Sequence, residues 1–179
     1  MTSLTHRCLT PEEFARIGDI DRTERIRRGY RIERGRLTAQ NGVWDVPPWT
    51  PEGPDHSVSS MVAALDDVHS HGGTVLATFD GERLVGVAAF RPRLTATMGQ
   101  LALLHVSHGY RRRGIASGLC REIEALARAS GATDLYVSAT PSESAVGFYR
   151  SRGFEVTNEP DPELYRLEPD DIHMIQPLT

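Results

Sequence analysis

Residues 106–116 constrain the fold of this chain more than any other segment. Their sequence, Val-Ser-His-Gly-Tyr-Arg-Arg-Arg-Gly-Ile-Ala, predicts the end of a strand, a short basic turn and the start of a helix. The first turn of a helix carries unpaired backbone N–H groups and a positive dipole end, which together attract anions. Gly114 and Ala116 have little or no side chain, so a phosphate can approach the backbone closely. The segment therefore predicts a site for a phosphorylated ligand.

Two motifs give the chain a resemblance to a known family. Arg111, Gly114 and Ala116 fill the pattern Arg/Gln-x-x-Gly-x-Gly/Ala, and residues 142–154 contain Ser-x-x-Ala-x-x-x-Tyr followed by Gly-Phe. With these motifs the chain resembles the GNAT superfamily of acyl-CoA-dependent N-acetyltransferases, in which Asn usually stands at the position of Ser142. One short glycine pattern is weak, but two motifs in the family's order, about 30 residues apart, are much more specific.

The resemblance implies a fold and a division of the chain. It implies an α+β fold in which helices flank a central, mostly antiparallel sheet that is splayed around the acyl-CoA site. Residues 1–179 would form a single N-acetyltransferase domain, a size that buries a substantial core. Residues 74–179 would be the acyl-CoA-binding core, and residues 1–73, where the resemblance is loose, would supply variable helices and a loop on the acceptor side.

Local signals predict the individual elements. The tetrapeptide Thr10-Pro11-Glu12-Glu13 resembles a capping box, so a helix is expected to run from there to about residue 28. Residues 30–45 favour a hairpin-like excursion with turn signals at Gly35 and Asn41-Gly42, and the four prolines of residues 46–56 indicate a loop. Further helices are expected over residues 57–71, over residues 112–130 with Ile115, Leu119 and Ile123 on one apolar face, and over residues 141–152 with Thr140 as cap. Strands are expected over residues 74–79, 83–91, 98–106, 135–139, 154–157 and 171–178, with Asp80-Gly81 as a hairpin signal and residues 158–170 as a linker.

The resemblance also implies where acetyl-CoA binds. The three arginines of the turn would pair with its pyrophosphate or 3′-phosphate, although a solvated basic turn is the alternative. Backbone N–H groups at the end of the preceding strand, exposed by a bulge, would stabilise the oxyanion of the reaction. The expected cofactor contacts are Leu104, Val106, Arg111, Arg112, Arg113, Gly114, Ile115, Ala116 and Ser142.

Two residues are expected to be catalytic. The family tyrosine at the position of Tyr149 lies near the cofactor sulfur and protonates the departing thiolate, although Tyr149 could instead be a core aromatic. A phenol with a pKa near 10 keeps its proton at neutral pH. For the general base, Gln100 stands where some relatives have Glu, so the candidates are His105, His108 and His173, or a chain of waters. His105 is the first of these, although a lone strand histidine is more often structural.

Four residues are expected to bind the acceptor. Asp21 and Glu24 are three apart and would share a helix face that attracts a cationic amine. Trp44 and Trp49 flank the proline-rich loop and would form an apolar or cation-binding wall. Solvated carboxylates and packing of the loop are the corresponding alternatives. The expected acceptor is a primary amine of a small molecule or a peptide.

Composition excludes several other functions. The net charge of −4 gives no support for nucleic-acid or membrane binding, and the seven arginines of residues 22–36 are interleaved with acidic or apolar residues. There is no apolar run of about 20 residues and no signal-peptide pattern, so a cytoplasmic protein is expected. His69 and His71 have no companions at metal-ligand spacing, so no metal is expected. A homodimer stays open, because family members often dimerise.

Two functions from different classes follow. The first is an enzyme that moves an acetyl group from acetyl-CoA to a primary amine, directly and in a ternary complex. The second is a non-catalytic module that binds or senses acyl-CoA. Tyr149 favours the enzyme, whereas Ser142 and the carboxylate missing at Gln100 leave room for the module.

Overall fold

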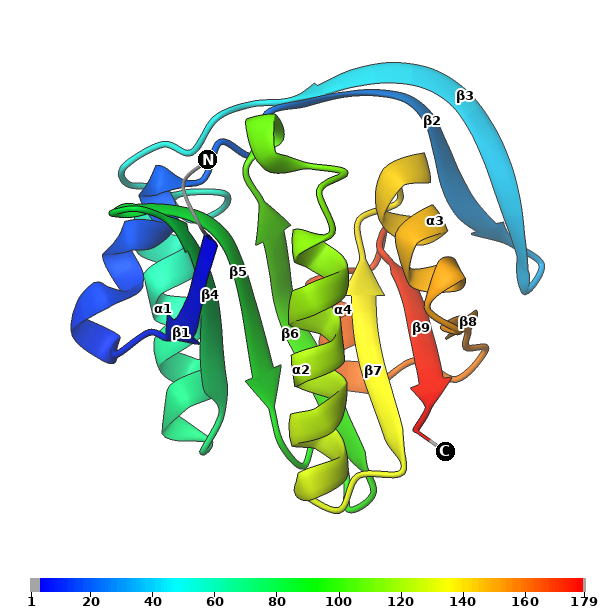
Figure 1. The fold of residues 1–179 in the computed structure, drawn as a ribbon. Helices are drawn as coiled ribbons and strands as arrows, with labels where there is room; N and C mark the ends of the chain where they lie inside the picture. Colours follow the sequence, from blue (N-terminus) through cyan, green and yellow to red (C-terminus); the bar gives the residue numbers. More distant parts are fainter. Residues whose placement is uncertain (1–3, 179) are drawn as a thin grey trace.

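A seven-stranded sheet forms the centre of the computed structural model, which describes residues 4–178 (Figure 1). Neighbouring strands are antiparallel except for one parallel pair, β6 and β7, so the expected α+β fold with a mostly antiparallel sheet is confirmed. In spatial order the strands are β1 (Leu4–Cys8), β4 (Thr74–Asp80), β5 (Arg83–Arg91), β6 (Met98–Val106), β7 (Asp134–Ala139), β9 (Ile172–Pro177) and β8 (Glu155–Val156).

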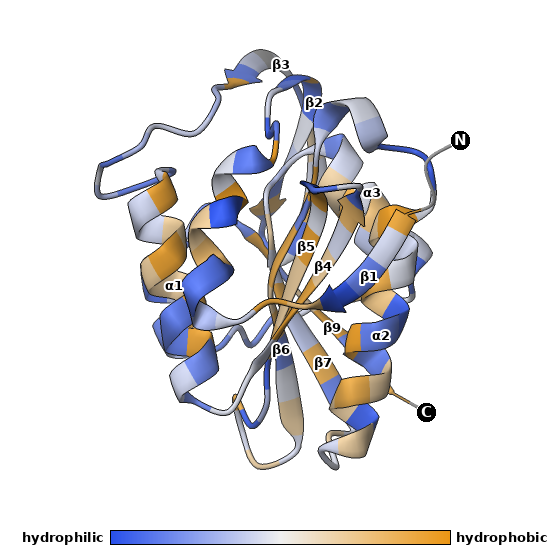
Figure 2. Cartoon of the chain, turned by 60° about the vertical axis from the view of Figure 1, so that its left-hand side comes forward, coloured by the Kyte–Doolittle hydropathy of each residue, from blue (hydrophilic) through white to orange (hydrophobic). Residues whose placement is uncertain are grey.

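Helices cover both faces of this sheet. The helices α2 (Ile115–Ala129) and α3 (Glu143–Ser151) lie on one face, and the 3-10 helix η1 (Pro11–Asp19) and α1 (Val58–Ser70) lie on the other (Figure 1). Figure 2 shows the apolar strands between α1 and α2. Because side chains alternate along a strand, Leu76 packs with α2 whereas Val75 and Ala77 pack with α1. Strands covered on both faces are apolar almost throughout, which explains why β4 and β5 gave clear sequence signals.

The packing of α2 follows directly from its sequence. Ile115, Leu119 and Ile123 recur every four residues, face the sheet and are almost completely buried. Burying each such side chain contributes about 1.5–3 kcal/mol relative to leaving it in water. This face therefore anchors the helix whose N-terminus follows the basic turn.

A two-stranded ribbon stands apart from the main sheet. Its strands, β2 (Glu24–Glu33) and β3 (Arg36–Val46), form an antiparallel hairpin that arches over one end of the molecule (Figure 1). Both residues of its turn, Arg34 and Gly35, have positive φ, as a tight two-residue hairpin turn requires. The ribbon is joined to the start of α3, where Tyr30 N donates to Pro141 O at 2.9 Å. It thus forms a roof over that end of the sheet.

The ribbon corrects the expected first helix. The helix predicted to reach residue 28 is a 3-10 helix that ends at Asp19, and the chain then becomes extended. The capping box is present, but residues 24–33 pair with β3 except at a bulge at Arg27, and this tertiary pairing outweighs local helix propensity. The turn falls at Gly35 as expected, whereas Asn41-Gly42 lies inside β3.

Most other elements agree with the sequence-based expectation, with two additions. The expected helix over residues 57–71 is α1, and the strands and helices of residues 74–157 are found within a few residues of their predicted bounds. Strand β1 was not predicted, and the expected linker contains a short helix, α4 (Pro162–Leu167), capped by Asp161. Within residues 4–178, no helix has the length and apolar character needed to cross a membrane.

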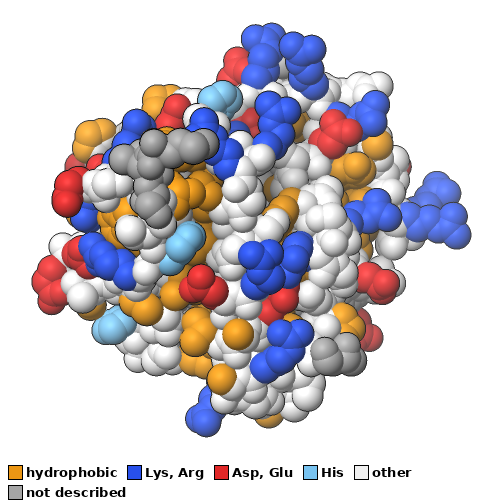
Figure 3. Space-filling view, viewed as in Figure 1, with side chains coloured by type: hydrophobic (Ala, Val, Ile, Leu, Met, Phe, Trp, Pro, Cys, Tyr) orange, Lys and Arg blue, Asp and Glu red, His pale blue; other side chains and the backbone are white. Residues whose placement is uncertain are grey.

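On the face shown in Figure 3, basic side chains are interspersed with acidic and neutral ones. Two of the ribbon's arginines form ion pairs: Arg28 with Glu143 of α3 at 3.4 Å, and Arg31 with Glu33 on the same strand. In the hairpin register, Arg25 lies opposite Asp45. The arginines of the ribbon thus have acidic neighbours, as their interleaved sequence suggested.

The contact between the ribbon and α3 can be tested at Gly29. A Cβ atom there would lie 2.5 Å from Trp44 Cη2 and 2.7 Å from the backbone oxygen of Pro141, so the ribbon would have to lift. We expect Gly29→Ala to lower the free energy of unfolding by about 1–3 kcal/mol, the usual cost of overpacking, in urea denaturation followed by tryptophan fluorescence. Gly42→Ala is the control, because a Cβ on Gly42 of β3 meets nothing within 4 Å. Equal effects of the two substitutions would contradict the close contact between the ribbon and the start of α3.

Candidate active site

The parallel strands β6 and β7 separate after a short paired stretch. Their register runs only from Met98 opposite Asp134 to Gln100 opposite Tyr136, and beyond it β7 continues to pair with β9 on its other side. From residue 101 onward the two strands share no paired residues within the described chain. One edge of β6 is therefore open toward β7 near the carboxyl ends of both strands.

A cavity of about 610 Å³ lies at this opening, a size typical of small-molecule sites. Its walls come from the end of β6, the basic turn, the first turn of α2, the start of α3 and the start of the ribbon. The lining residues are Arg22, Glu24, Ile26, Val46, Leu104, His105, Val106, Tyr110, Arg111, Arg112, Gly114, Ile115, Ala116, Ser117, Thr140, Ser142, Ser144, Ala145, Phe148 and Tyr149.

The open edge of β6 presents backbone N–H groups. Ser107 N donates to Val85 O of β5 at 2.9 Å, and the hydrogen bonds of an antiparallel pair alternate along the strand. The N–H groups of Leu104 and Val106 therefore point away from β5, toward the gap. The expected bulge is present in β6, but it falls at Ala102, which is the extra residue opposite β5.

The basic turn leaves the start of α2 accessible. Arg112 and Gly114 have φ of 61° and 82°, so the backbone curls into a concave turn before the helix. Gly114 is the N-cap residue, and no side chain of the described protein caps the helix there. The first intrahelical bond joins Gly118 N to Gly114 O, which leaves the N–H groups of the preceding helical residues for another acceptor.

The three arginines of the turn have different environments. Arg111 donates from Nε to Val106 O at 3.1 Å, from Nη1 to Glu24 Oε2 at 3.1 Å and from Nη2 to Arg22 O at 3.2 Å. This differs from the expected phosphate contact, because all three nitrogens of its guanidinium bind protein oxygens. Arg112 lines the cavity and is exposed, whereas Arg113 is outside the lining and stacks 5.1 Å from the ring centroid of Tyr110.

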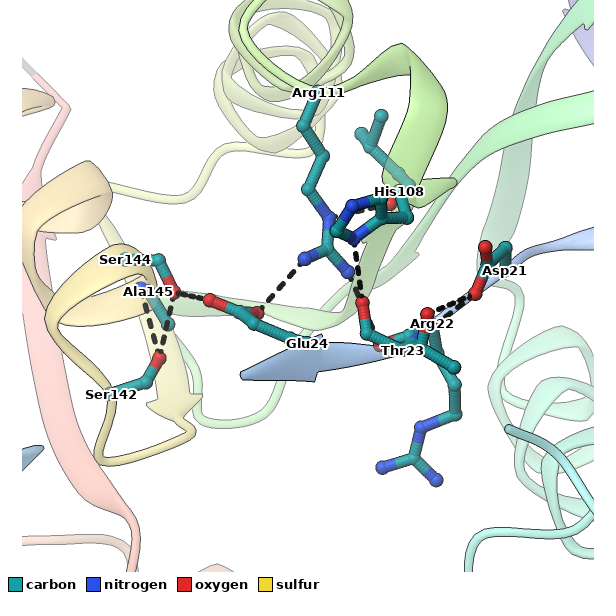
Figure 4. A network of polar contacts seen from close by, with 10 residues as sticks. Asp21, Arg22, Thr23, Glu24, His108, Arg111, Ser142, Ser144 and Ala145 are labelled. Atoms are coloured by element: carbon teal, nitrogen blue, oxygen red, sulfur yellow. Dashed lines mark hydrogen bonds and ion pairs between the residues drawn. The ribbon is translucent and has the colours of Figure 1, made fainter. Parts of the chain in front are cut away.

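Glu24 connects Arg111 to α3 through two serines (Figure 4). Its Oε1 accepts from Ser144 Oγ at 2.6 Å, Ser144 Oγ lies 3.0 Å from Ser142 Oγ, and Ser142 Oγ accepts from Ala145 N at 3.1 Å. Because the single hydroxyl proton of Ser144 goes to Glu24, the proton of Ser142 must point to Ser144. The Ser142 hydroxyl therefore caps α3 from within the cavity wall, and both its proton and one lone pair are already used.

Tyr149 lies at the base of the cavity, where α3 packs on the core. Its side chain is 7% exposed and makes edge-to-face contacts with Phe148 and Phe154, each with ring centroids 5.3 Å apart. Burial, followed by the nearby groups Cys120 and Asp171, raises the pKa of Tyr149 above its usual value. Tyr149 is therefore packed as a core aromatic, and it also presents to the cavity a phenol that stays protonated at neutral pH.

Sequence analysis did not identify Asp171, which influences Tyr149 electrostatically. Burial raises the pKa of Asp171 to about 7, and the neighbouring Glu168 and Asp170 act in the same direction. It is the first residue of the strand expected over residues 171–178 and follows the acidic residues of the linker, which gave no reason to single it out.

His105 occupies the opposite face of β6 from Leu104 and Val106. Leu104 and Val106 pack with the α2 side of the core, whereas His105 lies edge-on to Trp49 with ring centroids 5.3 Å apart, and Trp49 packs on the η1 and α1 side. Burial, followed by the positive charges of Arg22 and Arg111, lowers the pKa of His105 to about 4. The imidazole is therefore neutral at pH 7 and a weak base.

The other two histidine candidates have hydrogen-bonding partners within the protein. His108 Nδ1 lies 2.9 Å from Thr23 O, and His173 Nδ1 lies 2.7 Å from Tyr136 Oη inside the core. Neither residue lines the cavity. Among the described residues, no three His, Cys, Asp or Glu side chains cluster in a way that could hold a metal ion.

The acceptor-side residues are only partly brought together. Asp21 and Glu24 do not share a helix face, because the chain is extended there, and Asp21 Oδ1 accepts from the backbone N and hydroxyl of Thr23. Glu24 lines the cavity and Asp21 does not. Trp44 packs over Gly29 on the ribbon, and Trp49 contacts the ring of His105. Neither tryptophan is among the residues that line the cavity.

Several cavity residues were not identified from the sequence. Phe148 and Ser144 lie within the second motif, so the motif itself was a signal for them, and Tyr110 lies in the basic turn. Arg22 gave no signal, because it is one of many arginines in its region and reaches the cavity only through the path of the chain between η1 and the ribbon.

Comparison with known proteins identifies the family to which this sequence is similar. The profile of the acetyltransferase (GNAT) family matches residues 40–154. N-acetyltransferase 8 of Mus musculus is 34% identical over 105 residues, which cover 55% of this chain and 46% of that protein, so the chain spans about half the length of this curated relative.

Two solved structures are similar in fold. Nourseothricin acetyltransferase has a TM-score of 0.73 and 18% identity, covering 99% of this chain and 100% of that one. PaiA N-acetyltransferase of Thermoplasma acidophilum, solved in complex with coenzyme A, has a TM-score of 0.63 and 16% identity, covering 98% and 99% of the two chains. At these identities the similarity concerns the fold.

The depressed pKa of His105 predicts a pH-dependent stability. Because the folded pKa of about 4 lies below the ordinary value near 6.5, the unfolded chain binds an extra proton between these values. The contribution of His105 to the free energy of unfolding should therefore fall as pH drops from 6.5 to 4, and comparing the parent with a His105 variant separates it from Asp171, whose raised pKa acts in the opposite direction. We expect His105→Gln to remove roughly 2 kcal/mol of this fall in urea denaturation at the two pH values.

His108→Gln is the control for this pH effect, because His108 is exposed. It should leave the pH dependence of the parent unchanged. An equal loss of stability between pH 6.5 and 4 in the parent and in His105→Gln would contradict the assigned environment of His105.

Proposed function

Since the chain belongs to the GNAT family of acetyltransferases, we propose that it transfers an acetyl group from acetyl-CoA to a primary amine, directly and in a ternary complex. The observation that carries this proposal is a single cavity that joins an uncapped helix start, an open strand edge and a protonated tyrosine. These supply phosphate binding, oxyanion stabilisation and proton donation, which acetyl transfer from a thioester requires together.

The turn before α2 would hold the phosphates of the cofactor. The concave backbone at Arg112 and Gly114 and the free N–H groups of the first helical turn form a site for an anion. Ile115, Ala116 and Ser117 all line the cavity and belong to that first turn. Acetyl-CoA, once bound, supplies a thioester whose carbonyl can be attacked by an amine.

The open edge of β6 would stabilise the developing oxyanion. The N–H groups of Leu104 and Val106 point into the gap between β6 and β7 and, within the sheet, have no partner strand on that side. Donors fixed in a largely apolar cavity require little reorganisation when charge develops, which makes them effective for catalysis. The strand separation thus supplies the donors that an acyl-transfer reaction uses.

Tyr149 would protonate the leaving thiolate. Burial raises the pKa of its phenol, which at first makes it a weaker acid. Burial has the same effect on a thiol in the adjacent core, where it raises the pKa of Cys120 to about 11. A thiolate released beside Tyr149 would likewise be more basic than in water, so the cost of proton transfer from the phenol is smaller than burial of the phenol alone would make it.

Glu24 would orient the amine and accept its proton, directly or through water. It is the only carboxylate among the described residues that line the cavity, and its position is fixed by Arg111 and Ser144. A carboxylate attracts an ammonium group, which must lose a proton before it can attack. His105 is less suited to this role because its pKa is lowered to about 4.

The phosphate site can be tested with a charge-matched pair at Gly114. Its φ of 82° is tolerated better by Asn and Asp than by other side chains, so both substitutions impose a similar backbone strain. We expect Gly114→Asp to bind coenzyme A at least about tenfold more weakly than Gly114→Asn in titration calorimetry, because its carboxylate repels phosphate. Equal affinities of the two variants would show that the phosphates of coenzyme A do not bind at this turn.

The reaction can be tested at Tyr149 with a panel of primary amines. We expect Tyr149→Phe to lower kcat by about 100-fold while coenzyme A affinity is unchanged, measured as acetyl-CoA-dependent release of free thiol. Glu24→Gln should both raise KM for the amine and lower kcat, because it removes the negative charge and the proton acceptor. Coenzyme A binding without turnover of any amine by the parent would instead support the non-catalytic acyl-CoA-binding or sensing module.

A further inference from the structure

Arg22 is one of the residues that line the cavity, and its guanidinium forms no hydrogen bond or ion pair within residues 4–178. Its Nε and Nη1 atoms are shielded from solvent, and burial lowers its pKa from the usual value. A charged group taken out of water without a counter-charge destabilises a protein, because lost hydration is not replaced. The position of Arg22 therefore has a cost that the fold itself does not offset.

The two carboxylates nearest to Arg22 in the chain are engaged elsewhere. Asp21 accepts from Thr23, and Glu24 accepts from Arg111 and Ser144. Figure 4 shows the Arg22 side chain extending away from this network. The chain thus places carboxylates on both sides of Arg22 and pairs neither of them with it.

The orientation of Arg22 is fixed by Trp49. The guanidinium carbon lies 4.4 Å from the centroid of the Trp49 ring, a stacking arrangement that holds the planar group in place. Trp49 Nε1 is also buried and has no acceptor in the described chain, so a second N–H donor lies beside the first. Trp49 also contacts His105, which places this pair on the face of β6 opposite Leu104 and Val106.

We propose that Arg22 binds a carboxylate of the acceptor, so that the preferred substrate is an amino acid whose amine faces Glu24. This inference rests on the proposed acetyl transfer. Arg22 and Glu24 are two residues apart, line the same cavity and have opposite charges, which matches the two charges of a free amino acid. A guanidinium fork is suited to a planar carboxylate, and stacking on Trp49 holds that fork in place.

The test compares each of the twenty common amino acids with its own carboxamide as acceptor. The full chain is assayed with acetyl-CoA, and kcat/KM is measured from the release of free thiol. We expect the accepted amino acids to exceed their carboxamides by at least about tenfold, as for a hydrogen-bonded charge pair. Arg22→Gln should lose this preference, because the reaction of the acid falls much more than that of the carboxamide.

Two further variants separate binding from folding. Arg22→Lys keeps the charge but loses the planar fork, so it should retain part of the preference. Arg27→Gln is the matched control, because Arg27 is exposed on the ribbon and outside the cavity lining, and it should behave as the parent. Coenzyme A affinity should be the same in all three variants, since the phosphate turn is untouched.

The outcomes distinguish this inference from the proposed function. Acetylation of carboxamides or peptide N-termini as efficiently as free amino acids would overturn the carboxylate site and leave acetyl transfer in place. A preference for acids that survives in Arg22→Gln would overturn the role of Arg22. Coenzyme A binding with no transfer to any amine would overturn the proposed function, and this inference with it.

Discussion

The separation of β6 from β7 is the constraint on which the rest of the site depends. The strands pair over three residues and then diverge, so the sheet loses hydrogen bonds in its centre. A sheet normally satisfies such groups by continuing the ladder, and here the N–H groups of Leu104 and Val106 face a cavity instead. The same divergence lets groups from both faces of the sheet reach one space, with the α2 turn on one side and His105 on the other.

Arg111 connects the end of β6, beside this opening, to the ribbon. Its guanidinium joins the last residue of β6 to Glu24 and to the backbone before β2, and Glu24 continues the connection to α3 through Ser144 and Ser142. Partly buried, charge-assisted bonds of this kind are stronger than exposed ion pairs. The motif arginine therefore links the roof of the cavity to its wall, which a reading of the motif as a phosphate contact alone would overlook.

The sequence predicted the parts of the molecule whose partners are local or whose pattern is periodic. The helix α2 was visible in Ile115, Leu119 and Ile123, and the hairpin of β4 and β5 in Asp80-Gly81. The part of β2 before residue 30 was missed because the capping box at Thr10 predicted a helix there, and only the pairing with β3 in the folded chain overrides that local signal. Arg22 was missed for the same reason: only the tertiary path of the chain brings it to Trp49 and the cavity.

The manner in which Arg111 holds the chain before β2 has a consequence for how such a protein can diversify. Arg111 binds Arg22 through its carbonyl oxygen, an atom that every amino acid provides. The backbone at position 22 is therefore kept in place whatever side chain it carries. If Arg22 contacts the acceptor as proposed, a single substitution at this position would change the acceptor preference while the backbone around the cavity stays in place.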